Sequence, residues 1–184
     1  YVVPTGNFGN ILACYIAKKM GLFIDKIVCA SNENNVLTDF FNNKVYDKNR
    51  EFYLTNSPAM DILISSNLER LLYLITNNNE KLVNELMMDL KNKGSYELPI
   101  EYHNELNDFY AYSINPKDTV EYIKEVYNKY DYLIDPHTAV AYGAYTKYQN
   151  ILKGKTVVVS TASPFKFLET VDLRKLIGVI DENC

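Results

Sequence analysis

Apolar and polar positions along the chain follow two alternating patterns. Short apolar runs rich in β-branched residues predict strands, and longer stretches with apolar residues three and four positions apart predict helices. The predicted strands cover residues 1–3, 26–30, 109–114, 130–134, 156–160 and 176–180. The predicted helices cover residues 10–20, 35–42, 66–75, 80–92, 118–129 and 138–152. This alternation predicts an α/β fold: an open, mostly parallel twisted sheet with helices on both faces.

Several helix boundaries are marked by residues suited to them. Gly21 follows two lysines and is expected to end the first helix. Asn115 and Asp135 each precede a proline, so each is expected to cap the start of a helix. Residues 32–105 are mostly helical and polar, and we expect them to form a helical excursion within the one domain that residues 1–184 belong to.

Composition excludes several classes of protein. The formal net charge of −4 and the pI near 5.2 argue against a general nucleic-acid binder. No apolar run approaches the roughly 18 residues that a membrane span needs, and no signal peptide is visible. We therefore expect a cytoplasmic protein with a small-molecule partner, no nucleic acid and no membrane.

The cysteines have neither the spacing of a zinc site nor that of a disulfide framework. They are Cys14, Cys29 and Cys184. The first two lie in apolar segments and are expected to behave as small buried hydrophobic residues. We expect a reduced intracellular protein without a metal site.

A turn suited to phosphate lies between the first predicted strand and the first predicted helix. It reads Thr-Gly-Asn-Phe-Gly-Asn over residues 5–10. Backbone N–H groups at a helix N-terminus bind phosphate, and Gly6 and Gly9 have no Cβ to block its approach and can adopt positive φ. An ordinary tight turn is the plain alternative.

Two familiar nucleotide-binding motifs fit this turn less well. A Walker A loop is excluded, because no Lys-Ser/Thr follows at the required spacing. A dinucleotide fingerprint fits in part, since Glu33 follows the next strand, but the turn has two glycines where that fingerprint needs three. The monophosphate of a compact cofactor fits better.

Further motifs extend the pattern beyond this turn. The segments PTGNFGN, CASNENNVLTDFF, SPAMDILISSNLERLL, DPHTAVAYGAY and STASPFKF follow one another along the chain. In content and order they resemble threonine synthases, which are pyridoxal-phosphate enzymes of the tryptophan-synthase-β fold type (fold-type II). The resemblance spans Val3 to about Phe167. It implies that residues 1–184 are a C-terminal portion of a catalytic domain that binds pyridoxal 5′-phosphate.

The resemblance also implies which residues hold the cofactor. The backbone amides that would bind the 5′-phosphate are those of Gly6, Asn7, Phe8, Gly9 and Asn10. Thr161 would present its hydroxyl to the pyridine nitrogen, and a neutral hydroxyl does not force that nitrogen to stay protonated. A cap for the helix after Pro164 is the alternative role for Thr161, and Ser160 is the neighbouring candidate. The family often has His at the position of Ser163 and a small residue at that of Phe165, so this chain departs from the family pattern at both.

The Schiff-base lysine of this family lies upstream of the glycine loop, in a Phe-Lys-Asp type motif. No such motif occurs in the sequence. Lys166 belongs to the late STASPFKF segment, and Lys18 and Lys19 lie at the far end of their helix. The chain opens inside a predicted strand, without Met, so we expect a truncated piece that is inactive alone. It would have no catalytic residue of its own, and its lysine would lie upstream of Tyr1.

For the whole protein the resemblance implies conversion of O-phosphohomoserine and water to L-threonine and phosphate, by pyridoxal-phosphate-dependent elimination and hydration. A serine or threonine dehydratase is one alternative, and a non-catalytic phosphate-binding domain is another. Four further polar side chains are weaker candidates: His137, His103, Asn67 and Arg70. We expect His137 to cap or pack and His103 to be solvated. Capping by Ser65 or Ser66 is preferred to a substrate contact by Asn67 or Arg70.

Overall fold

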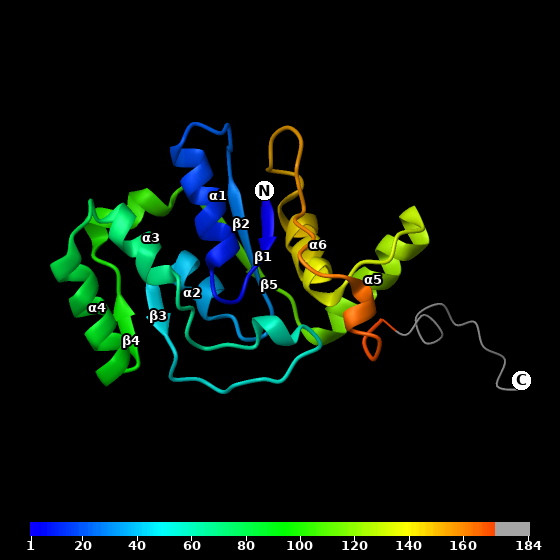
Figure 1. The fold of residues 1–184 in the computed structure, drawn as a ribbon, viewed down its shortest axis with the longest axis horizontal. Helices are drawn as coiled ribbons and strands as arrows, with labels where there is room; N and C mark the ends of the chain where they lie inside the picture. The colour runs from blue at the N-terminus through cyan, green and yellow to red at the C-terminus, as the bar shows by residue number, and fades with distance from the viewer. Residues whose placement is uncertain (172–184) are drawn as a thin grey trace, which may run out of the picture.

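A central sheet of parallel strands organises the chain, seen in a computed structural model that describes residues 1–171 (Figure 1). Its strands are β1 (Val2–Pro4), β2 (Ile27–Ser31) and β5 (Phe109–Ser113), in the order β1-β2-β5. Both neighbouring pairs are parallel. The predicted parallel sheet is therefore confirmed.

Helices cover both faces of this sheet. They are α1 (Gly9–Lys19), α2 (Val36–Asn43), α3 (Leu68–Ile75), α4 (Glu80–Asn92), α5 (Pro116–Tyr130) and α6 (Pro136–Tyr148). Alternate strand residues point to opposite faces: Cys29 packs with α1 to α4, whereas Val28 packs with α6. Figure 1 shows α1 and α2 on one side of the strands and α6 on the other. The helices predicted at residues 10–20, 35–42, 66–75, 80–92, 118–129 and 138–152 all exist. The helix at 80–92 has the predicted ends, and the ends of the others shift by a few residues.

The other three predicted strands, at residues 130–134, 156–160 and 176–180, have three different outcomes. The prediction at 130–134 is wrong: Tyr130 ends α5, and Asp131 at φ 50° turns the chain toward α6. The segment 156–160 forms only an isolated parallel bridge, between Val158 and Val2. Val2 N–H donates to Val157 O at 2.8 Å and Val159 N–H donates to Val2 O at 2.9 Å, so this segment lines the β1 edge. Residues 176–180 lie outside the described part of the chain.

The predicted helix boundaries are borne out by hydrogen bonds. At the end of α1, Gly21 at φ 104° donates its N–H to Lys18 O and Leu22 donates to Ala17 O, which satisfies two otherwise unpaired carbonyls. Asn115 Oδ1 accepts from Asp118 N–H at 2.8 Å at the start of α5. Asp135 caps α6 in the same way.

Residues 32–105 contain a small sheet that the sequence pattern does not indicate. Strands β3 (Val45–Asp47) and β4 (Ser95–Glu97) pair antiparallel. Each is too short for an alternation of apolar and polar residues to stand out. Tyr46 and Tyr96 stack with ring centroids 5.4 Å apart. The segment also holds the short 3-10 helices η1 (Pro58–Met60) and η2 (Ile100–Leu106). Within residues 1–171, no helix is long and apolar enough to cross a membrane.

Candidate phosphate-binding site

A cavity of about 260 Å³ lies at the carboxyl end of β1, where parallel sheets place their ligands. The turn after β1 contributes most of the lining, and residues 59–60, 67, 137 and 161 complete it from distant parts of the chain. Its lining residues are Pro4, Thr5, Gly6, Asn7, Phe8, Gly9, Asn10, Ala59, Met60, Asn67, His137 and Thr161. The structure therefore brings Thr161 to the same cavity as the glycine turn.

The backbone of this turn differs from the expectation at one point. Phe8, not a glycine, adopts the left-handed conformation, at φ 65°. Its ring is buried and stacks on Phe41, with centroids 5.8 Å apart. Left-handed φ costs a non-glycine residue about 1–3 kcal/mol, whereas burying a Phe side chain contributes about 1.5–3 kcal/mol, so packing offsets the strain.

Glycine at position 6 is needed for space. A Cβ placed on Gly6 would lie 2.7 Å from Ala59 O, closer than real Cβ contacts come. At Gly9 the nearest atom to such a Cβ is Asn67 Nδ2, at an ordinary 3.7 Å. The turn therefore presses its backbone against η1 at Gly6 and leaves room at Gly9.

The carbonyl groups of Gly6 and Asn7 accept hydrogen bonds from protein, whereas the amides of residues 6–10 donate to none within the described part of the chain. Gly6 O accepts from Ser65 Oγ at 2.8 Å, and Asn7 O accepts from Asn67 Nδ2 at 2.8 Å. Within residues 1–171, the backbone N–H groups of residues 6–10 donate to no protein acceptor. These amides stand at the N-terminus of α1, where the helix dipole adds positive potential. The arrangement suits an anion.

The segment after η1 supports the turn instead of capping the next helix. Asn67 is the N-cap of α3 and makes no side-chain cap hydrogen bond, so the expected capping by Ser65 or Ser66 is wrong. Tyr46 holds Ser65 in turn, because its hydroxyl accepts from Ser65 N–H at 2.8 Å and donates to Leu63 O at 3.1 Å. Burial raises the pKa of Tyr46 to about 12, so it keeps the proton that it donates.

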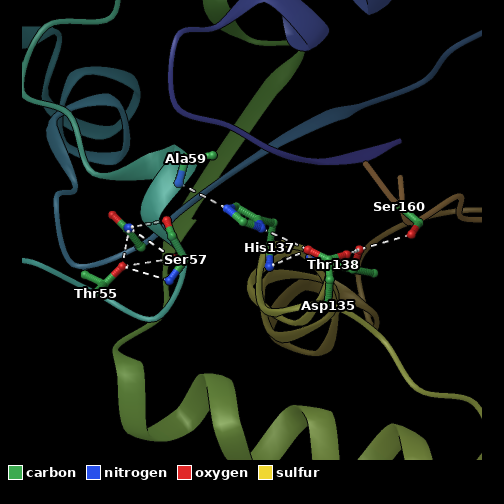
Figure 2. Close-up of polar contacts among 8 residues, drawn as sticks. Thr55, Ser57, Ala59, Asp135, His137, Thr138 and Ser160 are labelled. Carbon is green, nitrogen blue, oxygen red and sulfur yellow. Dashed lines mark hydrogen bonds and ion pairs between the residues drawn. The ribbon is translucent and has the colours of Figure 1, made fainter. Parts of the chain in front are cut away.

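His137, which lines the cavity, forms a buried pair with Asp135 (Figure 2). His137 Nδ1 lies 2.9 Å from Asp135 Oδ1, and His137 Nε2 accepts from Ala59 N–H at 3.2 Å. Burial by itself raises the pKa of Asp135. Hydrogen bonds from the His137 ring, the Thr138 hydroxyl and the His137 backbone N–H outweigh burial and lower that pKa below its ordinary value.

Comparison with known proteins now adds to this geometry. No protein-family model matches the chain. Threonine synthase of Saccharomyces cerevisiae is 39% identical over 189 residues, covering 94% of this chain and 37% of the relative. The chain belongs to the threonine synthase family. It spans less than two-fifths of that relative's length.

Solved structures agree with this family assignment. The PLP-bound threonine synthase from Brucella melitensis superposes with a TM-score of 0.88 at 35% identity, covering 97% of this chain and 38% of that one. The threonine synthase from yeast gives 0.89 at 35% identity, covering 100% and 39%. The α/β sheet with helices on both faces is thus the fold of threonine synthases.

Two other candidate side chains, Arg70 and His103, do not line this cavity. Arg70 lines a different cavity, of about 610 Å³, between α1, α3 and α4. His103 is half-buried and its Nε2 lies 2.8 Å from Leu98 O, so the expectation that it is solvated is wrong. Ser163, not Thr161, is the N-cap of the short helix η3 (Pro164–Lys166), which removes the capping alternative for Thr161.

Lysines are placed away from the cavity. Within the described residues, no lysine lines it. Lys18 lies at the far end of α1 and forms an ion pair with Asp108 at 2.9 Å. Among the cysteines, Cys29 is buried as expected, and Cys14 is half-buried.

The sequence motifs pointed to most of the cavity but missed part of its lining. Ala59, Met60 and Asn67 are not assigned to the cavity by the sequence, although the quoted motif SPAMDILISSNLERLL contains all three. For His137 the sequence favours a capping or packing role, whereas the structure places it in the lining. The pattern of strands and helices could not place these residues, because residues 59–67 follow β3 of the small sheet and His137 follows α5, so none of them follows a strand of the central sheet.

Proposed function

We propose that the cavity binds the 5′-phosphate and ring of pyridoxal 5′-phosphate, and that the whole protein is a threonine synthase. The observation that carries the proposal is the set of unpartnered backbone N–H groups at residues 6–10, in one cavity with Thr161. The PLP-bound state of the related Brucella protein supports the same cofactor.

The residues present fit a phosphate monoester. The N–H groups of Gly6, Asn7, Phe8, Gly9 and Asn10 donate to the phosphate oxygens at the positive end of α1. The bonds from Ser65 and Asn67 to the turn's carbonyls keep the backbone from rotating those amides away. No reorganisation is then needed when the anion binds.

Thr161 serves the other end of the cofactor. Within residues 1–171, its hydroxyl makes no hydrogen bond to protein, so it is available to the pyridine nitrogen. Pyridoxal phosphate, when bound, withdraws electrons from the carbon atoms next to the amino group of its substrate. A neutral partner such as Thr161 moderates that withdrawal.

We further propose that the lysine that binds the cofactor covalently lies outside these residues, and that the chain is inactive alone. The absence of a cavity-lining lysine in the described part supports this. Incubating the 184-residue chain with pyridoxal phosphate and borohydride should leave no single lysine modified in preference to the others. A stable adduct on one specific lysine would overturn this part of the proposal.

The reaction proposed for the whole protein is conversion of O-phosphohomoserine and water to L-threonine and phosphate. A cytoplasmic location remains a prediction from composition. The decisive assay is phosphate release from O-phosphohomoserine by the full-length protein carrying this sequence. We expect release together with formation of threonine.

Variants at Thr161 tie that activity to this cavity. Thr161→Ser keeps a hydroxyl and should retain most activity, whereas Thr161→Val should lose about tenfold or more, as for a lost hydrogen bond to the cofactor. Deamination of serine or threonine without phosphate release would favour the dehydratase. Binding of pyridoxal phosphate without turnover of either substrate would favour a non-catalytic domain.

A further inference from the structure

The Asp135–His137 pair has the appearance of a general base beside a cavity, but its hydrogen bonds exclude that role. Ala59 N–H is a donor, so His137 Nε2 must accept with its lone pair, and Nδ1 must carry the ring proton. That proton is donated to the ionised Asp135 at 2.9 Å. The basic nitrogen of His137 is therefore already occupied, and no lone pair remains for substrate.

The Ala59 contact acts on the phosphate turn. Ala59 lies in η1, and its carbonyl oxygen lies directly against the Cα of Gly6, as the 2.7 Å approach to an added Cβ shows. On its other side, η1 follows Ser57, whose Oγ lies 3.1 Å from Asn32 Nδ2 just after β2. The position of η1 is thus set from β2 on one side and from His137 on the other (Figure 2).

Asp135 is also connected to the part of the cavity that Thr161 lines. Asp135 Oδ2 accepts the hydroxyl proton of Thr138. Thr138 Oγ1 also lies 3.2 Å from Ser160 Oγ, within hydrogen-bonding distance. Ser160 directly precedes Thr161. One buried carboxylate therefore connects to both ends of the cavity.

We propose that Asp135 sets the distance between the two groups that bind the cofactor. It acts on the phosphate turn through His137 and on Thr161 through Thr138. His137 and Thr138 are positioning residues in this role: His137 acts through Ala59, and Thr138 acts through Ser160. The inference rests on the proposed function for the identity of the ligand. The positioning of the turn itself does not depend on it.

Two polar variants at His137 separate its two contacts. In His137→Asn the amide nitrogen replaces Nδ1 and still donates to Asp135, but no atom reaches Ala59. In His137→Gln the amide oxygen can take the place of Nε2 and accept from Ala59. The first readout is amide hydrogen exchange at Ala59, Met60 and Asn67 of the unliganded full-length protein. Their N–H groups are bonded to His137 Nε2, Ser57 O and Asn7 O, so they report on η1 and on the turn. We expect faster exchange in His137→Asn and near wild-type exchange in His137→Gln.

Binding measurements then distinguish the connection through His137 (the His137 arm) from the connection through Thr138 (the Thr138 arm). Affinities of pyridoxal 5′-phosphate and of pyridoxal, which lacks the phosphate, are compared by titration of the apo-protein. His137→Asn should weaken pyridoxal 5′-phosphate about fivefold to tenfold and leave pyridoxal unchanged. Thr138→Val should weaken both ligands alike, because it acts on the ring end, and Thr138→Ser should restore them.

Each result bears on the proposal. Equal behaviour of His137→Asn and His137→Gln, or an equal loss for both ligands in His137→Asn, would overturn the His137 arm. A Thr138→Val protein that binds like wild type would overturn the Thr138 arm, and this pair carries the test if His137→Asn does not fold. If wild type itself shows no preference for the phosphorylated ligand, the proposed function fails, while the exchange data still decide the positioning of the turn.

Discussion

The Ser65 hydroxyl donates a hydrogen bond to the Gly6 carbonyl oxygen at 2.8 Å, across 59 positions of sequence. Ser65 N–H is itself bonded to the Tyr46 hydroxyl. The excursion of residues 32–105 therefore supports the phosphate turn from outside the central sheet. This contact turns the carbonyl side of the turn toward protein and leaves the amide side facing the cavity.

Removing that hydroxyl should weaken both the fold and the site. In Ser65→Ala the Gly6 carbonyl loses its partner, which costs about 1–3 kcal/mol in the free energy of unfolding. Affinity for pyridoxal 5′-phosphate should fall with it. Chemical denaturation and cofactor titration measure the two effects. Ser66→Ala is the matched control, because Ser66 is exposed; an equal loss there would contradict the role given to Ser65.

Alanine at the two glycines of the turn should have unequal effects. Gly6→Ala brings a Cβ to 2.7 Å from Ala59 O and must displace η1 or the turn, at about 1–3 kcal/mol. Gly9→Ala meets only Asn67 Nδ2 at 3.7 Å and should change stability by no more than about 0.5 kcal/mol. Thermal unfolding of the unliganded protein makes the comparison without a contribution from phosphate. Equal melting temperatures for the two variants would contradict the contact with η1.

Two substitutions at Phe8 separate the stabilisation from burying its ring from the cost of its left-handed backbone conformation. Phe8→Ala removes a buried ring and keeps the left-handed backbone, so we expect a loss of about 3–5 kcal/mol. Phe8→Gly removes the same ring but relieves the strain, so it should be the more stable variant by about 1 kcal/mol. Urea denaturation of both variants measures the difference. A less stable Phe8→Gly would mean that the conformation at Phe8 carries no strain.

Asp135 should give the protein a stability that disappears in acid. Its pKa in the folded protein is lowered below the ordinary 3.8, so the ionised form favours folding. That contribution is fully present above the ordinary value and is lost as the pH falls through the lowered one. Asp135→Asn should be less stable at neutral pH by about 1–3 kcal/mol, because an amide nitrogen cannot accept from the Thr138 hydroxyl.

The difference between wild type and Asp135→Asn should therefore shrink below about pH 4. Unfolding free energies measured by denaturant titration from neutral pH downward give this curve. Asp131→Asn removes a nearby exposed carboxylate and serves as the control. A gap between wild type and Asp135→Asn that stays constant down to the lowest pH would show that the carboxylate charge does not contribute.

Prediction from sequence succeeded where the governing physics is local. The helix at residues 80–92 was predicted with its observed bounds, and Asn115 and Asp135 cap the helices that they precede. Capping and helical periodicity involve residues within a few positions of one another. Prediction failed for β3 and β4, which are short, and for residues 130–134, where Leu133 and Ile134 pack against helices α5 and α6 instead of in a sheet.

The sequence by itself determined the alternation of strand and helix, the glycine turn before α1 and the order of the family motifs. Only the tertiary structure decided that Phe8, not a glycine, takes the left-handed conformation, because the burial of its ring against Phe41 offsets the strain. Only it could decide that Ser65 supports the turn and that Thr161 shares its cavity. Those relationships depend on contacts between segments far apart in the chain, which no local pattern of residues encodes.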